Sequence, residues 1–427
     1  MLRRIAQELK QGKILLEFGF FKGTGQALGM IAPLVVAKFL SSAESFGSYC
    51  LAKMILFFFT SILVTSAQAP FVVFANQERT QTQKINKSFS VQFVLFILGF
   101  VVFFAITIPL NKYLTIFAKI GGRDLPFVLL AYVGLALKIF LCNLFMSLGQ
   151  RIKNSLVELT FGAATLSVVF GLYFTGMLSL RTVFLAYLAS GLLVVAMFIG
   201  TIDFRQLTPF GIDKKHCKEM FDFTKWLMLG ATAVYFINWG GNLVLRLFVS
   251  TGYISLSDIG TYNLGYQIFK GIIMLTFVVN TYFLPFVSEH IENTDKIRSY
   301  LFNKKPKILL VGLIVIVAVY FVFPYVRRMV YGDVYQDSVT LLRILLIGPM
   351  LMLYSVFYET LLLAVKKYRF TQCIYVLQVF LNLFLTFLLV PVMGLPGAAV
   401  ATVVAYFCRA VTIEIYFRIK LQKLLGL

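Results

Sequence analysis

Polar and basic side chains interrupt some of the most apolar stretches of this sequence, and their spacing lines them up on single helix faces. Asn238, Asn242 and Arg246 follow one another at intervals of four residues, so a helix would stack them one turn apart. A charge at the centre of a membrane helix costs about 2.5–3.5 kcal/mol on insertion scales. Such a face therefore requires a partner helix, an interface or a water-filled cavity.

Two other apolar stretches carry the same pattern. Asn263, Gln267 and Lys270 share one helix face, and Lys22 and Gln26 share another. Amide side chains often join packed membrane helices, so the asparagines and glutamines alone are compatible with helix packing. A lysine or arginine on each of the three faces favours a positively charged, water-filled cavity instead.

Basic residues prevail over acidic ones inside the apolar stretches. Lys53 adds a fourth cation, whereas most acidic residues near these stretches lie within a turn or two of their ends. A basic cavity suits an anionic cargo, and phosphate or pyrophosphate is the anion that several lysines and arginines bind best. Glu17 and Glu359 are the candidates for coupling transport to a proton or a sodium ion.

Twelve apolar segments are the elements that must hold these side chains. Hydrophobic residues make up 59% of the 427 residues and charged residues 13%, which leaves too little polar surface for a water-soluble protein. Each segment reaches the roughly 20 residues with which a helix crosses a bilayer. Landmarks of the first half recur in the second, close to half the chain length later: Gly47-Ser48-Tyr49 has its counterpart in Gly260-Thr261-Tyr262.

These features predict an all-α polytopic membrane protein, with twelve transmembrane helices in two pseudo-symmetric six-helix lobes around a central cavity. We expect an N-terminal lobe over residues 1–205, a cytoplasmic inter-lobe linker over 206–220 and a C-terminal lobe over 221–427. Six helices per lobe is an even number, so both lobes enter the membrane in the same sense. An axis along the membrane normal then relates them.

The distribution of positive charge predicts the orientation. Most of the 39 lysines and arginines fall in alternate connecting segments, beginning with the N-terminal one. Cytoplasmic loops hold such an excess, so both termini are expected in the cytoplasm. This topology accounts for most of the net charge of +21, and a nucleic-acid partner is not expected.

Nothing in the sequence predicts an enzyme, a cofactor or a metal site. The five cysteines are scattered and form no ligand cluster, and His216 and His290 both fall in segments expected in the cytoplasm. No phosphate-cradling glycine loop, carboxylate pair or nucleophile motif stands out.

Longer motifs give the chain a family resemblance, and they span residues 43–49, 257–265, 280–285 and 389–402. With them the sequence resembles, over essentially its whole length, the polysaccharide-biosynthesis flippases of the multidrug/oligosaccharidyl-lipid/polysaccharide exporter superfamily. The resemblance implies that an undecaprenyl-pyrophosphate-linked oligosaccharide repeat unit crosses the bacterial cytoplasmic membrane by alternating access, for O-antigen, capsule or exopolysaccharide synthesis. The implied partners are the lipid bilayer and the lipid-linked oligosaccharide, with a glycan polymerase and glycosyltransferases as further candidates.

The same resemblance implies roles for particular residues. In the family, the first, second, seventh and eighth helices line the central cavity, and Lys22, Lys53, Arg246 and Lys270 fall on those helices. These cations would hold the pyrophosphate, and the polar faces around them would hold the sugars.

Two alternatives stay open. A cation-coupled multidrug antiporter of the same superfamily would depend on an acidic residue inside a lobe, and Glu17 or Glu359 would have to serve. A membrane glycan polymerase has similar length and composition, but such enzymes usually carry a sizeable external loop. The external loops expected here are short, which disfavours the enzyme.

Overall fold

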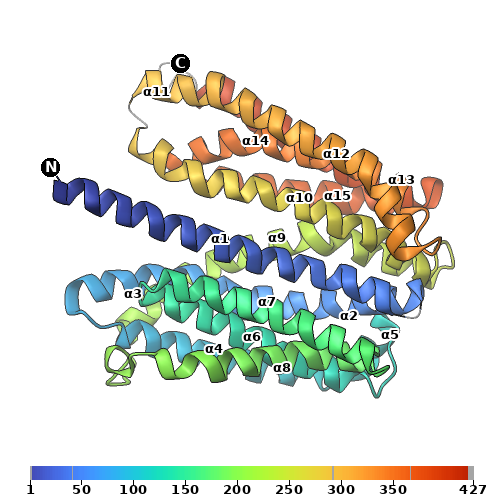
Figure 1. The fold of residues 1–427 in the computed structure, drawn as a ribbon, viewed down its shortest axis with the longest axis horizontal. Helices are drawn as coiled ribbons and strands as arrows, with labels where there is room; N and C mark the ends of the chain where they lie inside the picture. Colours follow the sequence, from blue (N-terminus) through green and yellow to red (C-terminus); the bar gives the residue numbers. More distant parts are fainter. Residues whose placement is uncertain (1, 41, 291–292, 366, 422–427) are drawn as a thin grey trace. The chain divides into compact units, whose positions relative to one another are not determined.

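The computed structural model describes residues 2–40, 42–290, 293–365 and 367–421, and in these ranges it consists of helices and their connections, without a strand (Figure 1). The predicted all-α class is confirmed. The helices of the first half are α1 (Leu2–Phe39), α2 (Ala43–Phe59), α3 (Gln68–Thr82), α4 (Asn86–Thr107), α5 (Asn111–Ala118), α6 (Leu125–Ser147), α7 (Arg151–Phe174) and α8 (Leu180–Phe198). Those of the second half are α9 (Lys214–Ser250), α10 (Leu256–Glu289), α11 (Thr294–Ser299), α12 (Lys305–Tyr331), α13 (Ser338–Leu345), α14 (Ile347–Ala364), α15 (Tyr368–Met393) and α16 (Leu395–Tyr416).

The helices agree with the predicted set of twelve spans. Within the described residues, ten segments are long and apolar enough to cross a membrane, six in the first half and four in the second. The long helices α9, with 37 residues, and α10, with 34, lie between these two groups and complete the twelve. The chain is a multi-pass membrane protein.

The second span is less regular than predicted. It runs from Ala43 to Thr82, and a π turn at Thr60–Val64 and a 3-10 turn at Thr65–Ala67 separate α2 from α3. The Thr60 and Ser66 hydroxyls donate to the carbonyls four residues before them, a bond that bends helices. Pro70 then removes one amide donor from the first turn of α3.

Helix packing divides the chain into two compact units. Unit 1 comprises Met1–Leu40 and Leu51–Thr232, and unit 2 comprises Ser41–Cys50 and Ala233–Leu427. Two helices therefore contribute to both units: α2 begins in unit 2 and continues in unit 1, and α9 does the reverse. The lobe boundaries predicted at residues 205 and 221 stay a prediction.

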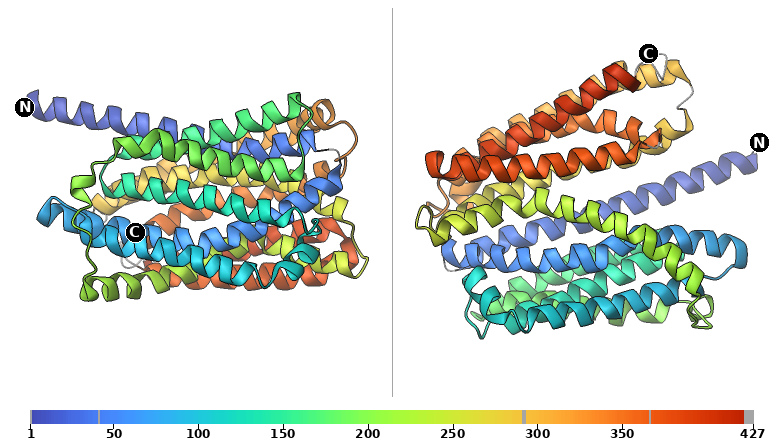
Figure 2. Two further views of the ribbon diagram at one scale, coloured as in Figure 1. Left: turned by 90° about the horizontal axis from the view of Figure 1, so that it is seen from below. Right: turned by 180° about the vertical axis from the view of Figure 1, so that it is seen from behind.

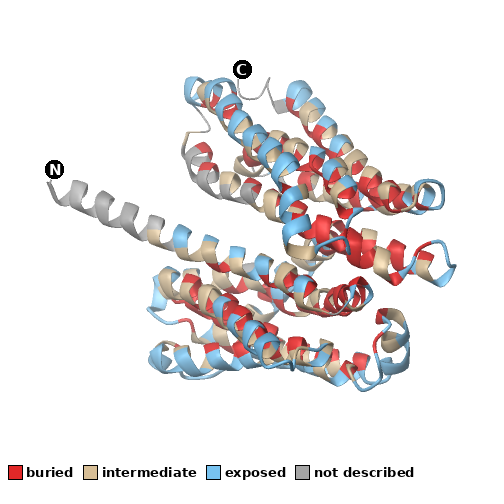
Figure 3. Ribbon diagram, turned by 45° about the vertical axis from the view of Figure 1, so that its right-hand side comes forward, coloured by how far each residue is buried: buried red, intermediate tan, exposed pale blue. Residues whose placement is uncertain are grey.

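Each unit has its own packed interior. In unit 1, α7 lies beside α1, α6 and α8 (Figures 1 and 2), and in unit 2, α14 packs on α10 and α16. Buried residues collect on one face of most helices and exposed residues on the other (Figure 3). The exposed positions of α12 include Leu310, Ile314 and Phe321, an apolar surface suited to lipid.

The start of the predicted linker is attached to unit 1. Asn86 donates to the Pro209 carbonyl at 3.0 Å, and Ser88 Oγ lies 2.9 Å from His216 Nε2. Asp213 bonds Lys87 Nζ at 3.1 Å. That bond, with a backbone amide of His216, lowers the pKa of Asp213 below its ordinary value. The first half of the linker is thus held at the start of α4.

Candidate functional site

A cluster of three charges lies inside unit 1. Glu158 on α7 binds two cations: its Oε2 accepts from Lys22 Nζ of α1, and its Oε1 from Lys138 Nζ of α6 at 2.8 Å. Asn154 adds an Oδ1 acceptor for Lys22 at 3.2 Å. The side chains are 27% (Lys22), 18% (Lys138) and 14% (Glu158) exposed, so solvent or a ligand reaches the group only in part.

Small residues and a buried amide bring these three helices together. A β-carbon at Gly25 would stand 2.7 Å from the Leu159 amide nitrogen, so only glycine lets α1 approach α7 this closely. Asn154 Nδ2 donates to the Cys142 carbonyl at 2.6 Å and joins α7 to α6. The cluster sits directly beside both contacts, which makes its geometry a property of helix packing.

Two ammonium groups share one carboxylate in this cluster, which leaves one positive charge in excess. An uncompensated charge in a low-dielectric interior is costly, and an added anion would offset it. The cluster therefore has the electrostatics of an anion site. It includes the predicted Lys22 and two residues that were not predicted, Lys138 and Glu158.

Sequence spacing contains a signal for this pairing. Lys138 lies ten residues before Leu148, the first residue after α6, and Glu158 lies ten residues after it. In a helical hairpin these two distances place both side chains at the same depth. Glu158 lies about two turns after the start of α7, among the acidic residues near the ends of the apolar stretches, where a solvent-facing carboxylate is the simpler expectation.

The predicted polar faces of α9 and α10 meet in unit 2. Asn263 Nδ2 donates to Asn242 Oδ1 at 2.7 Å, so these two amides join the helices as the packing interpretation expects. Arg246 is buried and donates to Ser250 Oγ at 2.9 Å. Asn238 is half-buried and donates to the Val234 carbonyl of its own helix.

The same faces retain polar atoms without a hydrogen-bond partner. Among the described residues, Asn242 Nδ2, Asn263 Oδ1 and Gln267 Nε2 are buried and unsatisfied. Buried polar atoms usually have a protein or water partner, so each of the three is open to a ligand or a water molecule. The faces carry donors and an acceptor of the kind that sugar hydroxyls use.

Lys270 lies between aromatic rings of the two helices. Its Nζ is 3.9 Å from the centroid of the Trp239 ring and 4.7 Å from that of Tyr266. The rings stabilise the ammonium by cation–π interaction and hold it half-buried between α9 and α10.

Three further predicted residues belong to unit 1. Lys53 on α2 is 7% exposed, with its Nζ 5.5 Å from the Phe57 ring centroid. Gln26 and Glu17 on α1 are half-buried. Binding roles for Lys53 and Gln26, and an ion-coupling role for Glu17, stay predictions.

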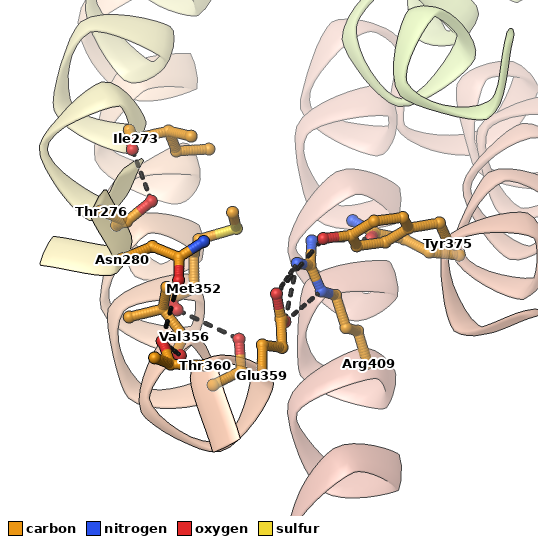
Figure 4. A network of polar contacts seen from close by, with 11 residues as sticks. Ile273, Thr276, Asn280, Met352, Val356, Glu359, Thr360, Tyr375 and Arg409 are labelled. Carbon is orange, nitrogen blue, oxygen red and sulfur yellow. Dashed lines mark hydrogen bonds and ion pairs between the residues drawn. The ribbon is translucent and has the colours of Figure 1, made fainter. Parts of the chain in front are cut away.

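Glu359 has a cationic partner in the interior of unit 2 (Figure 4). Arg409 Nε and Nη2 donate to its Oε1 at 2.9 and 2.7 Å, and Nη2 also reaches Oε2 at 2.8 Å. Tyr375 donates to Oε2 at 3.3 Å, and Gln378 accepts from Arg409 Nη1 at 3.2 Å. The Arg409 and Glu359 side chains are 2% and 5% exposed, so the pair joins α14, α15 and α16 as balanced charges.

A second polar contact in Figure 4 joins α14 to α10. The Thr360 hydroxyl contacts Asn280 Oδ1 at 2.9 Å, and it also donates to the Val356 carbonyl of its own helix. Neighbouring positions of α14 thus face two different helices, Glu359 toward α16 and Thr360 toward α10.

The helices and their buried charges define the class first: a multi-pass membrane protein built like known transporters. An inward-facing multidrug resistance MATE family transporter of the MOP superfamily is similar with a TM-score of 0.77 at 13% identity, over 93% of this chain and 95% of that one. The lipid II flippase MurJ, in an inward closed conformation, gives 0.72 at 14% identity over 94% and 87%. The MATE multidrug transporter DinF-BH gives 0.71 at 15% identity over 97% of each chain.

The family follows from the sequence. The model of the polysaccharide biosynthesis protein family matches residues 35–340, and the chain belongs to that family. No curated protein sequence matches it. The resemblance expected from the motifs is confirmed.

Proposed function

We propose that this protein flips an undecaprenyl-pyrophosphate-linked oligosaccharide from the inner to the outer leaflet of the bacterial cytoplasmic membrane. The observation that carries the proposal is the cluster of Lys22, Lys138 and Glu158, whose surplus positive charge is partly exposed inside the membrane region. Membership of the polysaccharide biosynthesis family supports a glycan cargo. The flippase activity named for one similar structure supports a lipid-linked one.

The two units differ in the charge that they offer a ligand. Arg409 and Glu359 in unit 2 are buried and neutralise one another, so this pair has no excess positive charge with which to bind an anion. Lys22 and Lys138 in unit 1 share a single carboxylate. A pyrophosphate group supplies the missing negative charge and competes with Glu158 for Lys22, because charge-assisted hydrogen bonds to phosphate are among the strongest in proteins.

The polar faces of unit 2 suit the sugars of the same cargo. The unsatisfied atoms of Asn242, Asn263 and Gln267 offer hydrogen bonds to hydroxyl groups. The polyprenyl tail stays in lipid. Glycosyltransferases supply this cargo on the cytoplasmic side, where both termini lie in our proposal, and a polymerase or ligase consumes it outside.

Alanine substitution of the two lysines tests the proposal. In a strain that depends on this protein for surface glycan, Lys22→Ala and Lys138→Ala should each lower export about tenfold or more, because a hydrogen bond to a charged group contributes about 1.5–3 kcal/mol. Surface glycan is measured per unit of membrane-inserted protein. Lys225→Ala is the matched control, because Lys225 is 52% exposed and pairs with Asp222 near the start of α9.

Wild-type export by both cluster variants would remove the basis of the proposal.

The second candidate function is a cation-coupled multidrug antiporter, which the similarity to MATE transporters favours. Drug-resistance profiles on overexpression separate the two. An antiporter raises drug resistance and leaves surface glycan unchanged. A flippase supports surface glycan and leaves drug resistance unchanged.

A further inference from the structure

Two glycines that mark the sequence repeat lie in a backbone contact within unit 2, where α2 and α10 begin. A β-carbon on Gly47 would overlap the carbonyl oxygen of Leu256, and a β-carbon on Gly260 would overlap the carbonyl oxygen of Ala43. A side chain at either position would push the two helices apart, so glycine is required at both.

The contact is reciprocal with respect to the repeat. The interval in the sequence from Gly47 to Gly260 is equal to the interval from Ala43 to Leu256. Gly47 contacts the Leu256 carbonyl, and the equivalent residue, Gly260, contacts the carbonyl of Ala43, which is the equivalent of Leu256. Contacts of this kind, in which position i meets j and the equivalent of i meets the equivalent of j, form only around a two-fold axis.

The helix starts repeat the same geometry. Ser42 Oγ accepts from the Ser45 amide at 3.1 Å, and Ser255 Oγ accepts from the Asp258 amide at 3.1 Å. The repeat interval that relates the two glycines also relates these two pairs, so the caps of α2 and α10 are equivalent as well. The symmetry extends from the caps through the first turn of each helix.

In a transporter with parallel repeats, the axis runs along the membrane normal and the substrate passes between the repeats. A contact on that axis therefore closes the path at one end. That end is the one at which α1 finishes and α2 begins, which is external if the N-terminus is cytoplasmic. We propose that the Gly47–Gly260 contact is the external seal of the transport path, and that it opens each time the path faces outward.

Several features suit this contact to repeated opening. It consists of backbone atoms from the first turns of the two helices, and α10 otherwise packs mainly on α13 and α14. Phe46, the residue before Gly47, is fully buried and lies edge-on to Tyr335, with 6.1 Å between the ring centroids. The chain passes from unit 2 to unit 1 directly after Cys50, so only the first turns of α2 belong to the unit that contains α10.

Cys50 reports on the seal. It lies one turn after Gly47, is 1% exposed and belongs to the same unit. The experiment uses the full-length protein in cells, with Cys50 retained and the other four cysteines changed to serine, and adds a membrane-impermeant maleimide from outside. The four replaced cysteines are Cys142, Cys217, Cys373 and Cys408.

Gly47→Ala and Gly260→Ala should each accelerate labelling of Cys50 about tenfold, which corresponds to ~1.4 kcal/mol against the sealed state. Gly29→Ala is the control, because nothing lies within 4 Å of the β-carbon it would add. Labelling of both seal variants at the rate of the control would overturn the proposal.

A second measurement leaves both glycines in place, in case the variants fail to insert. Labelling of Cys50 is compared between cells that synthesise the lipid-linked glycan and cells in which that synthesis is blocked. A change of about threefold or more supports a seal that opens during transport, and an unchanged rate contradicts it. Labelling of the glycine variants requires no cargo, so a wrong cargo assignment would show in glycan export and leave that first result intact.

Discussion

Glu158 is the one acidic residue of the three-charge cluster, and it forms ion pairs with both lysines. Its carboxylate is the counter-ion of both Lys22 and Lys138, and Glu158→Gln leaves two ammonium groups unpaired among packed helices. Removal of one partner from a buried ion pair costs about 3–5 kcal/mol. The cost is smaller here because the three side chains keep some access to solvent. We expect a lower Tm for this variant in detergent.

An added anion should restore what the substitution removes. Pyrophosphate is expected to raise the Tm of the Glu158→Gln protein more than that of the wild type, because it replaces the lost carboxylate between the lysines. The measurement is a thermal unfolding series in pyrophosphate against sodium chloride of equal ionic strength. Equal shifts in both salts would indicate general screening, and the cluster would then be no anion site.

At the scale of the helices, substitutions in the Glu359–Arg409 pair distinguish a structural role of Glu359 from a role in ion coupling. A structural pair predicts that Glu359→Gln lowers the stability by about 3–5 kcal/mol, because Arg409 is left as an unpaired buried charge. The double variant Glu359→Gln with Arg409→Met should recover part of that loss. Thermal unfolding measures both variants.

The outcome for transport separates the two roles of Glu359. With a structural pair, the amount of folded protein falls and export per folded molecule stays near the wild-type value. Loss of the dependence on an imposed ion gradient in a well-folded Glu359→Gln protein would instead support the coupling role.

The membrane helices could be predicted because each of them corresponds to one long, continuous run of apolar residues in the sequence. The interruptions of those helices depend on contacts that a single stretch does not contain. The π turn at Thr60–Val64 and the break between α13 and α14 are of this kind. The lysines and arginines inside the spans were also visible, but their partners Glu158 and Glu359 come from other helices. Only the Lys138–Glu158 pair has a signal in the sequence, because both residues lie at equal distances from the turn of their hairpin.

At the scale of the whole molecule, charge determines how the chain lies in the membrane. Alternate connections hold most of the 39 lysines and arginines, and positively charged loops stay in the cytoplasm. The connection between α4 and α6, which contains Gly121, and the one after α12, which contains Gly332, should then lie outside.

Reporter fusions test this orientation. A fluorescent protein that matures only in the cytoplasm should fluoresce when fused after Leu427, and alkaline phosphatase, active only outside, should be active when inserted at Gly121 or Gly332. The same two reporters exchanged between the sites serve as controls and should both be silent. The reverse pattern would place the Gly47–Gly260 contact at the cytoplasmic end of the path, and the seal would then control entry of the cargo and not its release.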